Sequence, residues 1–210
     1  MNSILLKCEN AVKKYNGKVI FKNVTLELTS GSSLVVTGKN GSGKSTLLKV
    51  ICNLVRLDKG KIELTYNGSI LPTGEQYRRT GLLAPYLNLY DELTAYENLR
   101  FFGKLNGNGK ERDEHINFLL EKVGLYKRRN DLMRNFSSGM KQRLKLAFAV
   151  QKDPGLLLLD EPRTNLDVEG IDVVYKIAEE QKQKGILIIA TNEKEDASLC
   201  SQTLNIEDYK

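Results

Sequence analysis

The stretch Gly38-Lys39-Asn40-Gly41-Ser42-Gly43-Lys44-Ser45-Thr46 fits the pattern G-x-x-x-x-G-K-[ST] of a phosphate-binding loop. The residues before it, Ser33–Thr37, are typical of a buried β-strand, and the residues after it, Thr46–Ile51, are typical of a helix. A strand, the loop and a helix in this order form the structural context that such a loop requires. The sequence therefore predicts a nucleotide site at the start of that helix.

Each residue type in this loop has a physical reason to be there. Glycines let the backbone turn tightly and bring successive N–H groups close to an anion. The helix that follows directs its free N–H groups and the positive end of its dipole at the same point. We expect the whole loop, Gly38 to Thr46, to contact the nucleotide. Within it, Lys44 would place a charge on the β- and γ-phosphates, and the Ser45 hydroxyl would bind magnesium.

The composition indicates an ordinary globular chain. Its 210 residues are enough for one domain, 1–210, with a lobe inserted in it. No apolar run approaches the roughly 18 residues that span a bilayer, and the N-terminus lacks the apolar stretch of a signal peptide. We therefore expect a cytoplasmic protein, with Cys8, Cys52 and Cys200 as reduced thiols.

The formal net charge of +6 indicates only weak affinity for anions, because Lys and Arg are spread along the chain. The densest basic run, Lys127-Arg128-Arg129, is short and has no aromatic residues between its charges. A solvated surface is the preferred interpretation of this run over a nucleic-acid patch. We therefore expect no direct nucleic-acid partner.

Strands and helices alternate along most of the chain. The first part is β-rich, with short strands expected over Ile4–Cys8, Val19–Phe21, Val24–Leu28 and Gly60–Tyr66. The phosphate-loop helix should run to about Val55, and a later helix should span about Glu169–Lys184 and end at Gly185. Apolar strands are expected at Leu156–Leu159 and Ile186–Ala190, with a last strand at Thr203–Ile206.

Residues 91–151 are predicted to be mostly helical and to form an insertion in the α/β core. Asn106-Gly107-Asn108-Gly109 should interrupt this segment, and Gly124 should cap a helix over Glu111–Val123. The only histidine, His115, falls off the apolar stripe of that helix. We therefore predict an exposed His115 without a catalytic role.

The strand Leu156–Leu159 leads directly into two carboxylates, Asp160 and Glu161. In ATPases with a phosphate loop, an aspartate at the end of such a strand holds Mg²⁺, and an adjacent glutamate polarises the attacking water. Asp160 is therefore the predicted magnesium residue besides Ser45. Glu161 is the predicted catalytic residue together with Lys44.

A third motif precedes the carboxylate strand. In Phe136-Ser137-Ser138-Gly139-Met140-Lys141-Gln142-Arg143, a serine is placed to cap the following helix. A capped helix start with free N–H groups is also an anion site, so both interpretations hold together.

With these motifs the chain resembles the nucleotide-binding subunit of an ATP-binding-cassette (ABC) transporter over nearly its whole length. Gly38–Thr46 is similar to the family's Walker A loop, and Leu156–Glu161 to its Walker B strand. Phe136–Met140 resembles the LSGGQ signature, of which it keeps the serine and the second glycine. Thr164–Asp167 looks like the D-loop, and Tyr15 stands where the family places an aromatic residue that stacks on adenine.

The resemblance implies a P-loop NTPase core with a mainly parallel sheet, an antiparallel N-terminal subdomain and a helical subdomain. It implies ATP and Mg²⁺ as ligands and hydrolysis of the ATP. Two subunits would pair head to tail, so that Ser137, Ser138 and Gly139 touch the γ-phosphate bound by the partner chain. Closing and opening of this dimer would drive an integral membrane subunit, to which the chain would be peripheral at the inner face of the cell membrane.

Two positions depart from the family's pattern. The glutamine expected in the segment Gly81–Thr94 falls on Pro85, which has no side-chain amide, and Tyr86 and Asn88 are the nearby residues that could reach the site instead. The switch histidine expected after Thr191 is replaced by Asn192, which can bond to a phosphate but carries no titrating proton. We therefore expect normal nucleotide binding and slow hydrolysis.

Two other functions compete with a transporter ATPase. One is an ATP-switched dimer that hydrolyses little and acts as an assembly module. The other is a soluble ABC-type ATPase that acts on nucleic acid, although this chain has one cassette and no CxxC pair. The transported substrate, its direction and the choice between a homodimer and a heterodimer are not encoded in motifs of this chain.

Overall fold

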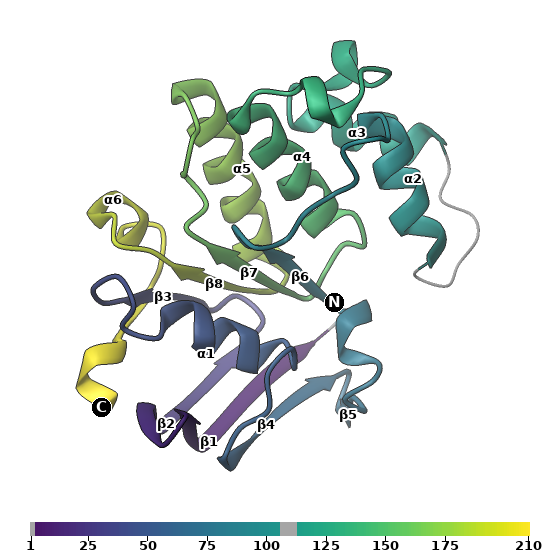
Figure 1. The fold of residues 1–210 in the computed structure, drawn as a ribbon. Coiled ribbons are helices and arrows are strands. Elements are labelled where there is room, and N and C mark those ends of the chain that lie inside the picture. The colour runs from purple at the N-terminus through teal and green to yellow at the C-terminus, as the bar shows by residue number, and fades with distance from the viewer. Residues whose placement is uncertain (1–2, 106–112) are drawn as a thin grey trace.

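A computed structural model describes residues 3–105 and 113–210 (Figure 1). The strands are β1 (Ile4–Tyr15), β2 (Lys18–Thr29), β3 (Ser33–Thr37), β4 (Lys59–Tyr66), β5 (Ser69–Ile70), β6 (Thr80–Leu83), β7 (Leu156–Asp160), β8 (Ile186–Ala190) and β9 (Gln202–Asn205). The helices are α1 (Lys44–Ile51), α2 (Ala95–Leu105), α3 (Asp113–Lys122), α4 (Ser138–Val150), α5 (Val168–Lys184) and α6 (Lys194–Ala197).

The strands form two sheets. One has the order β6-β7-β8-β3-β9, and all its neighbouring strands run parallel. The other has the order β2-β1-β4-β5 and is antiparallel. Helix α1 lies between the two sheets, and α2, α3, α4 and α5 lie on the far side of the parallel sheet (Figure 1). The predicted α/β class, with an antiparallel part and a helical part, is confirmed.

Both faces of the parallel sheet are buried, and alternate residues of its strands serve two cores. In β7, Leu157 and Leu159 pack into the core formed with α2 to α5, while Leu156 and Leu158 pack into the core formed with α1 and the antiparallel sheet. All four leucines have no exposed surface. Burial of each contributes about 1.5–3 kcal/mol, which explains why a continuous apolar run forms this strand.

The N-terminal strands are longer than predicted. Residues expected to form three short strands lie in β1 and β2, each of 12 residues, joined by a turn in which Asn16 and Gly17 have φ values of 49° and 78°. The prediction broke the strands where register shifts between Cys8 and Ala11 disturb the apolar alternation. The turn itself follows the Asn-Gly preference of tight hairpins.

The helical segment agrees with the prediction in part. Helices α2, α3 and α4 fall within residues 91–151, but short 3₁₀ turns and loops connect α3 to α4. Gly124 follows α3 with φ of 69°, as expected of a helix end. The predicted break Asn106–Gly109 lies outside the described residues, as does Glu111.

The predicted exposure of His115 is wrong. Its side chain is half-buried, and its Nε2 lies 2.8 Å from the carbonyl oxygen of Gln151, at the end of α4. The partner is 36 residues away in the chain, so helical periodicity alone could not reveal it.

Helix α1 and strand β6 also differ from the prediction. Helix α1 ends at Ile51 rather than near Val55, because Asn53 takes a φ of 59° and the chain turns back. Strand β6 was not predicted. Its Gly81 has the backbone of α4 so close that a Cβ there would lie 2.1 Å from the Ala149 carbonyl oxygen.

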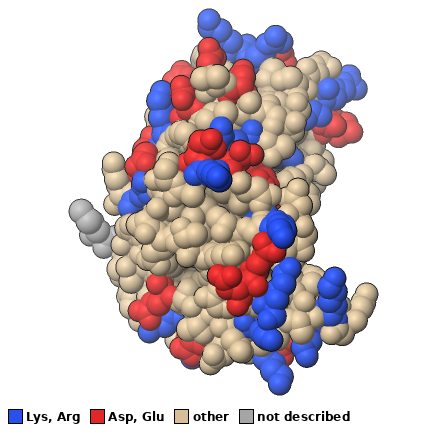
Figure 2. All heavy atoms as spheres, turned by 90° about the vertical axis from the view of Figure 1, so that its left-hand side faces the viewer, with Lys and Arg blue, Asp and Glu red and all other residues tan. Residues whose placement is uncertain are grey.

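The surface carries both signs of charge. Figure 2 shows one face, on which Lys and Arg lie among Asp and Glu. Within the described residues, no helix is both long enough and apolar enough to cross a membrane.

Candidate nucleotide site

The phosphate loop joins β3 to α1 in a conformation that depends on glycine. Gly38 and Gly43 have φ values of 138° and 115°, which side chains rarely tolerate. A Cβ on Gly43 would lie 2.7 Å from Cγ2 of Ile20 on β2, and one on Gly38 would lie 2.8 Å from a side-chain carbon of Ile206. Strand β2 and the chain after β9 therefore pack directly against the loop.

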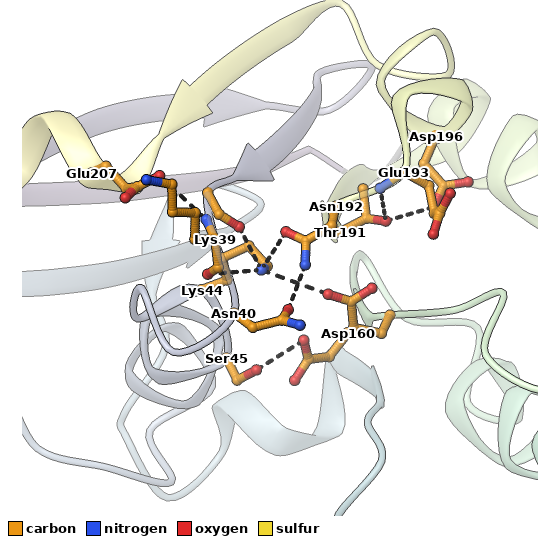
Figure 3. A network of polar contacts seen from close by, with 12 residues as sticks. Lys39, Asn40, Lys44, Ser45, Asp160, Thr191, Asn192, Glu193, Asp196 and Glu207 are labelled. Carbon is orange, nitrogen blue, oxygen red and sulfur yellow. Dashed lines mark hydrogen bonds and ion pairs between the residues drawn. The ribbon is translucent and has the colours of Figure 1, made fainter.

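Lys44, the first residue of α1, is the centre of the site (Figure 3). Its ammonium donates to the carbonyl oxygen of Gly38 at 2.7 Å and to Oδ1 of Asn192 at 2.7 Å. A longer bond of 3.4 Å reaches the Lys39 carbonyl, and Oε1 of Glu161 lies 3.6 Å away. Only 6% of the side chain is exposed, so its charge is balanced by these oxygens rather than by water.

Ser45 and Asp160 meet although they lie 115 residues apart in the chain. The Ser45 hydroxyl donates to Oδ1 of Asp160 at 3.0 Å. The second oxygen, Oδ2, is buried and has no hydrogen-bond partner among the described residues. Burial raises the pKa of Asp160, opposed by the Ser45 bond and by the charges of Lys44 and Lys49. An unpaired buried carboxylate oxygen beside a hydroxyl is suited to bind a cation.

Glu161 has an unusual backbone. Its φ of 48° lies in the left-handed region, and its N–H donates to the Ala190 carbonyl of the neighbouring strand at 2.8 Å. The bend turns the side chain toward Lys44, and 29% of it remains exposed. Burial raises the pKa of this carboxyl, and the Lys44 ammonium lowers it less. Such strain in a charged residue is typical of functional sites.

Asn192 closes the site from the end of β8. Its Oδ1 accepts from Lys44, and its Nδ2 donates to Oδ1 of Asn40 in the phosphate loop (Figure 3). One amide thus links the loop to the central lysine. The structure places Asn192, a predicted site residue, against Lys44 and Asn40, and its contact with a nucleotide stays a prediction.

The signature residues lie at the start of α4. Ser137 caps this helix, and its hydroxyl accepts from the Met140 N–H at 3.2 Å. Ser137 and Ser138 are exposed, and a Cβ on Gly139 would lie 2.8 Å from the Asn165 carbonyl oxygen. Within residues 3–105 and 113–210, no hydrogen bond joins these three residues to the phosphate loop. The exposed Ser137 and Ser138 are therefore accessible to another molecule.

Tyr15 lies at the end of β1, beside the turn into β2. Its side chain is 44% exposed, and the ammonium of Lys13 lies 5.0 Å from the ring centroid. Lys13 is in turn held by Asp58 at 3.1 Å. The ring is thus restrained and partly open to solvent, as a stacking platform requires.

The segment after β6 shows what replaces the expected glutamine. Pro85 is exposed and occupies a turn closed by a bond from the Leu87 N–H to the Ala84 carbonyl. The turn brings Tyr86 onto α1, where the ammonium of Lys49 lies 4.0 Å from its ring centroid. Burial, Cys52 and the charge of Asp160 raise the pKa of Tyr86. Tyr86 therefore lies near the Asp160 side of the site although it is 38% exposed, and Asn88 is exposed as well.

The residues present fit a magnesium ion. Ser45 supplies a hydroxyl and Asp160 a carboxylate, which are hard oxygen ligands. Within the described residues, no group of three or more His, Cys, Asp or Glu side chains could enclose a metal by itself. The remaining ligands would come from water and from phosphate oxygens, the usual arrangement for Mg²⁺ in ATPases.

Comparison with known proteins identifies the class. The family model described as ABC transporter matches residues 21–164, more than half of the chain. The chain therefore belongs to the ABC transporter ATP-binding family, the class of proteins that the fold and the loop define.

Among its relatives is the linearmycin resistance ATP-binding protein of Bacillus subtilis, 34% identical over 194 residues. That match covers 90% of this chain and 61% of the relative, so the chain spans less than two thirds of it. The cytochrome c biogenesis ATP-binding export protein of Mannheimia succiniciproducens is 31% identical and is matched over 95% of its length, with 98% of this chain.

Two solved structures have the same fold. One is an ATP-binding subunit of an ABC transporter, 29% identical, with a TM-score of 0.83 over 97% of this chain and 87% of that chain. The other is a dimeric ATP-binding cassette in a post-hydrolysis state with ADP and Pi, with a TM-score of 0.84 over 97% of this chain and 94% of that one. At 24% identity, the second supports the fold alone.

Proposed function

We propose that this chain binds and hydrolyses MgATP and powers a transporter through a separate membrane subunit. The observation that carries the proposal is the position of the Lys44 ammonium. It lies among two loop carbonyls, Glu161 and Asn192, next to the Ser45–Asp160 pair. The groups that would bind phosphate and activate water come from three separate parts of the sequence, 38–45, 160–161 and 192, and lie together.

The loop residues would bind the phosphates of ATP. The N–H groups at the start of α1 have no partners within the helix, and the Lys44 ammonium lies beside the loop that precedes them, bonded to the Gly38 carbonyl. Ser45 and Asp160 would hold Mg²⁺, which when bound neutralises charge on the phosphate oxygens. Lys44 would exchange its bonds to Asn192 and Glu161 for bonds to phosphate. Asn192 would then be free to donate to a γ-phosphate oxygen from its amide nitrogen.

Glu161 would orient the attacking water and accept its proton. Its bent backbone and its partly exposed carboxylate place it beside Lys44, where the γ-phosphate would lie. The raised pKa from burial makes it a better proton acceptor than an exposed glutamate. The Lys44 ammonium lies 3.6 Å from this carboxylate and holds it beside the phosphate loop.

A second subunit would complete each site. Ser137 and Ser138 lie exposed at a helix start, with Gly139 half-buried beside them, and these three residues would contact the γ-phosphate held by the partner. Closing on ATP and opening after hydrolysis would transmit motion to the membrane subunit, and the chain would work at the cytoplasmic face through that contact. These steps follow the family to which the chain belongs.

A dimer that binds ATP and hydrolyses little is the second candidate. The observation that favours it is Asn192, which stands at the site without a titrating group. Pro85 also removes a side-chain amide from the segment after β6.

Steady-state ATP hydrolysis tests the first function and separates it from the second. We expect a measurable wild-type rate, a loss of about 100-fold in Glu161→Gln, and a gain in Asn192→His. A wild-type rate that does not change in Glu161→Gln would reject Glu161 as the catalytic residue. ATP-dependent dimerisation without turnover, even with the membrane partner present, would favour the second candidate.

A further inference from the structure

Asp196 is a buried carboxylate next to the candidate site that the proposed chemistry does not use. It belongs to the short helix α6 and has no exposed surface. Burial raises its pKa, while its hydrogen bonds and the charge of Arg163 oppose this. A buried carboxylate lowers stability unless hydrogen bonds and an opposite charge compensate for its lost hydration. The groups that contact Asp196 therefore indicate its role.

One partner is Thr191, the residue before Asn192. The Thr191 hydroxyl donates to Oδ2 of Asp196 at 2.8 Å and accepts from the Glu193 N–H at 3.0 Å (Figure 3). The hydroxyl thus connects both sides of Asn192 to one carboxylate. Asn192 follows directly, and its amide reaches Lys44 and Asn40. The direction of that amide therefore depends on a loop that Asp196 holds.

The other partners lie on the opposite side of the carboxylate. Oδ1 of Asp196 accepts from the Tyr175 hydroxyl of α5 at 3.3 Å and lies 3.8 Å from the guanidinium of Arg163. Arg163 immediately precedes the segment Thr164–Asp167, where Asn165 touches the start of α4. The same arginine also pairs with the exposed Glu195 at 3.2 Å.

An open pocket of 260 Å³ has Glu161, Arg163 and Thr191 in its lining. Glu161 and two partners of Asp196, Thr191 and Arg163, therefore border the same space. A shift of Arg163 or Thr191 into the pocket has room to occur, and the network opposes it.

We propose that Asp196 is a positioning residue. Through Thr191 it holds Asn192 facing Lys44, and through Arg163 it restrains the segment Thr164–Asp167, which lies beside the start of α4. The buried carboxylate of Asp196 thereby fixes the position of the Asn192 amide relative to the segment Thr164–Asp167. The effect on turnover rests on the proposed function, but the positioning itself does not.

The test compares two carboxylates of the same helix that both contact Arg163. Asp196→Asn keeps the shape and removes the charge. The matched control, Glu195→Gln, makes the same change on the exposed neighbour. Hydrogen exchange of the nucleotide-free chain is measured in peptides that cover 190–193 and 163–167, and kcat and KM are measured with MgATP. Thr191→Val is a third variant that keeps volume and removes the hydroxyl.

We expect Asp196→Asn to exchange about tenfold faster in both segments and to lose about tenfold in kcat, with KM changed less than about twofold. Glu195→Gln should stay within about twofold of wild type in all readouts. Thr191→Val should accelerate exchange in 190–193 only.

Wild-type exchange in either segment of Asp196→Asn, or equal effects of the two carboxylate variants, would overturn the proposal. If Asp196→Asn does not fold, acceleration of 163–167 in Thr191→Val would overturn it instead. Faster exchange in both segments of a chain without any turnover would support the positioning role and reject the proposed function.

Discussion

The hydrogen bond between Lys44 and Asn192 offers a direct test of how the Lys44 side chain is held. Asn192→Ala removes an acceptor at 2.7 Å from a lysine whose side chain is 6% exposed. It also removes the donor to Asn40. Water cannot readily replace the lost acceptor because the ammonium is enclosed, so the free energy of unfolding should fall.

The magnitude follows from the bonds that remain. A hydrogen bond to a charged group contributes about 1.5–3 kcal/mol. Lys44 keeps the Gly38 carbonyl at 2.7 Å and Glu161 at 3.6 Å. The loss should therefore be near the low end, about 1.5–2 kcal/mol, which corresponds to a decrease of about 3–8 °C in Tm for a chain of this length.

Thermal unfolding without nucleotide is the assay, and Asn40→Ala is the matched control. Asn40→Ala breaks the contact at the other end of the Asn192 amide and leaves Lys44 bonded. It should lower Tm by less than half as much. Equal Tm values for the two variants, or an Asn192→Ala variant as stable as wild type, would refute the reasoning.

Three further predictions concern the loop, the metal residue and the aromatic platform. Gly43→Ala adds a Cβ 2.7 Å from Ile20 at φ of 115° and should lower the free energy of unfolding by about 2–4 kcal/mol in urea, whereas Gly41→Ala, with open space around it, should cost about 1 kcal/mol. Burial raises the pKa of Asp160 in the folded chain, so the folded chain loses stability as the pH rises above 3.8, the ordinary pKa of an aspartate. Asp160→Asn should therefore raise the Tm measured without nucleotide at pH 7, and this gain should vanish below pH 3.8. Tyr15→Leu should weaken ATP binding about two- to tenfold by calorimetry while Tyr15→Phe does not, and equal affinities of the two would exclude stacking.

The sequence was most informative where one physical demand dominates. Strands β3 and β8 begin and end at the predicted residues, because an apolar run buried on both faces has few alternatives. The glycines of the phosphate loop have the positive φ values that their type suggests. The residues Lys44, Ser45, Asp160, Glu161 and Asn192 lie together in the structure as the motifs led us to expect.

Features that depend on distant neighbours could not be predicted. A glycine disfavours a strand in sequence, yet Gly81 lies within β6. Only a residue without a side chain fits there, because the backbone of α4 lies directly against it. Helical periodicity predicts an exposed His115, but its ring contacts the carbonyl oxygen of Gln151, which is distant in the chain. Tyr86 acquires its position only from the turn at Pro85 and from Lys49 of α1. In each case the partner is set by packing rather than by local periodicity.

Calorimetric titration of ATP with Mg²⁺ into the wild type and Lys44→Ala tests the central claim most directly. Lys39→Ala is the control, because it changes an exposed lysine of the same loop. We predict saturable binding to the wild type and to Lys39→Ala, and binding at least about 100-fold weaker to a folded Lys44→Ala. Equal affinity of Lys44→Ala and wild type would contradict the claim that this lysine is the centre of the nucleotide site.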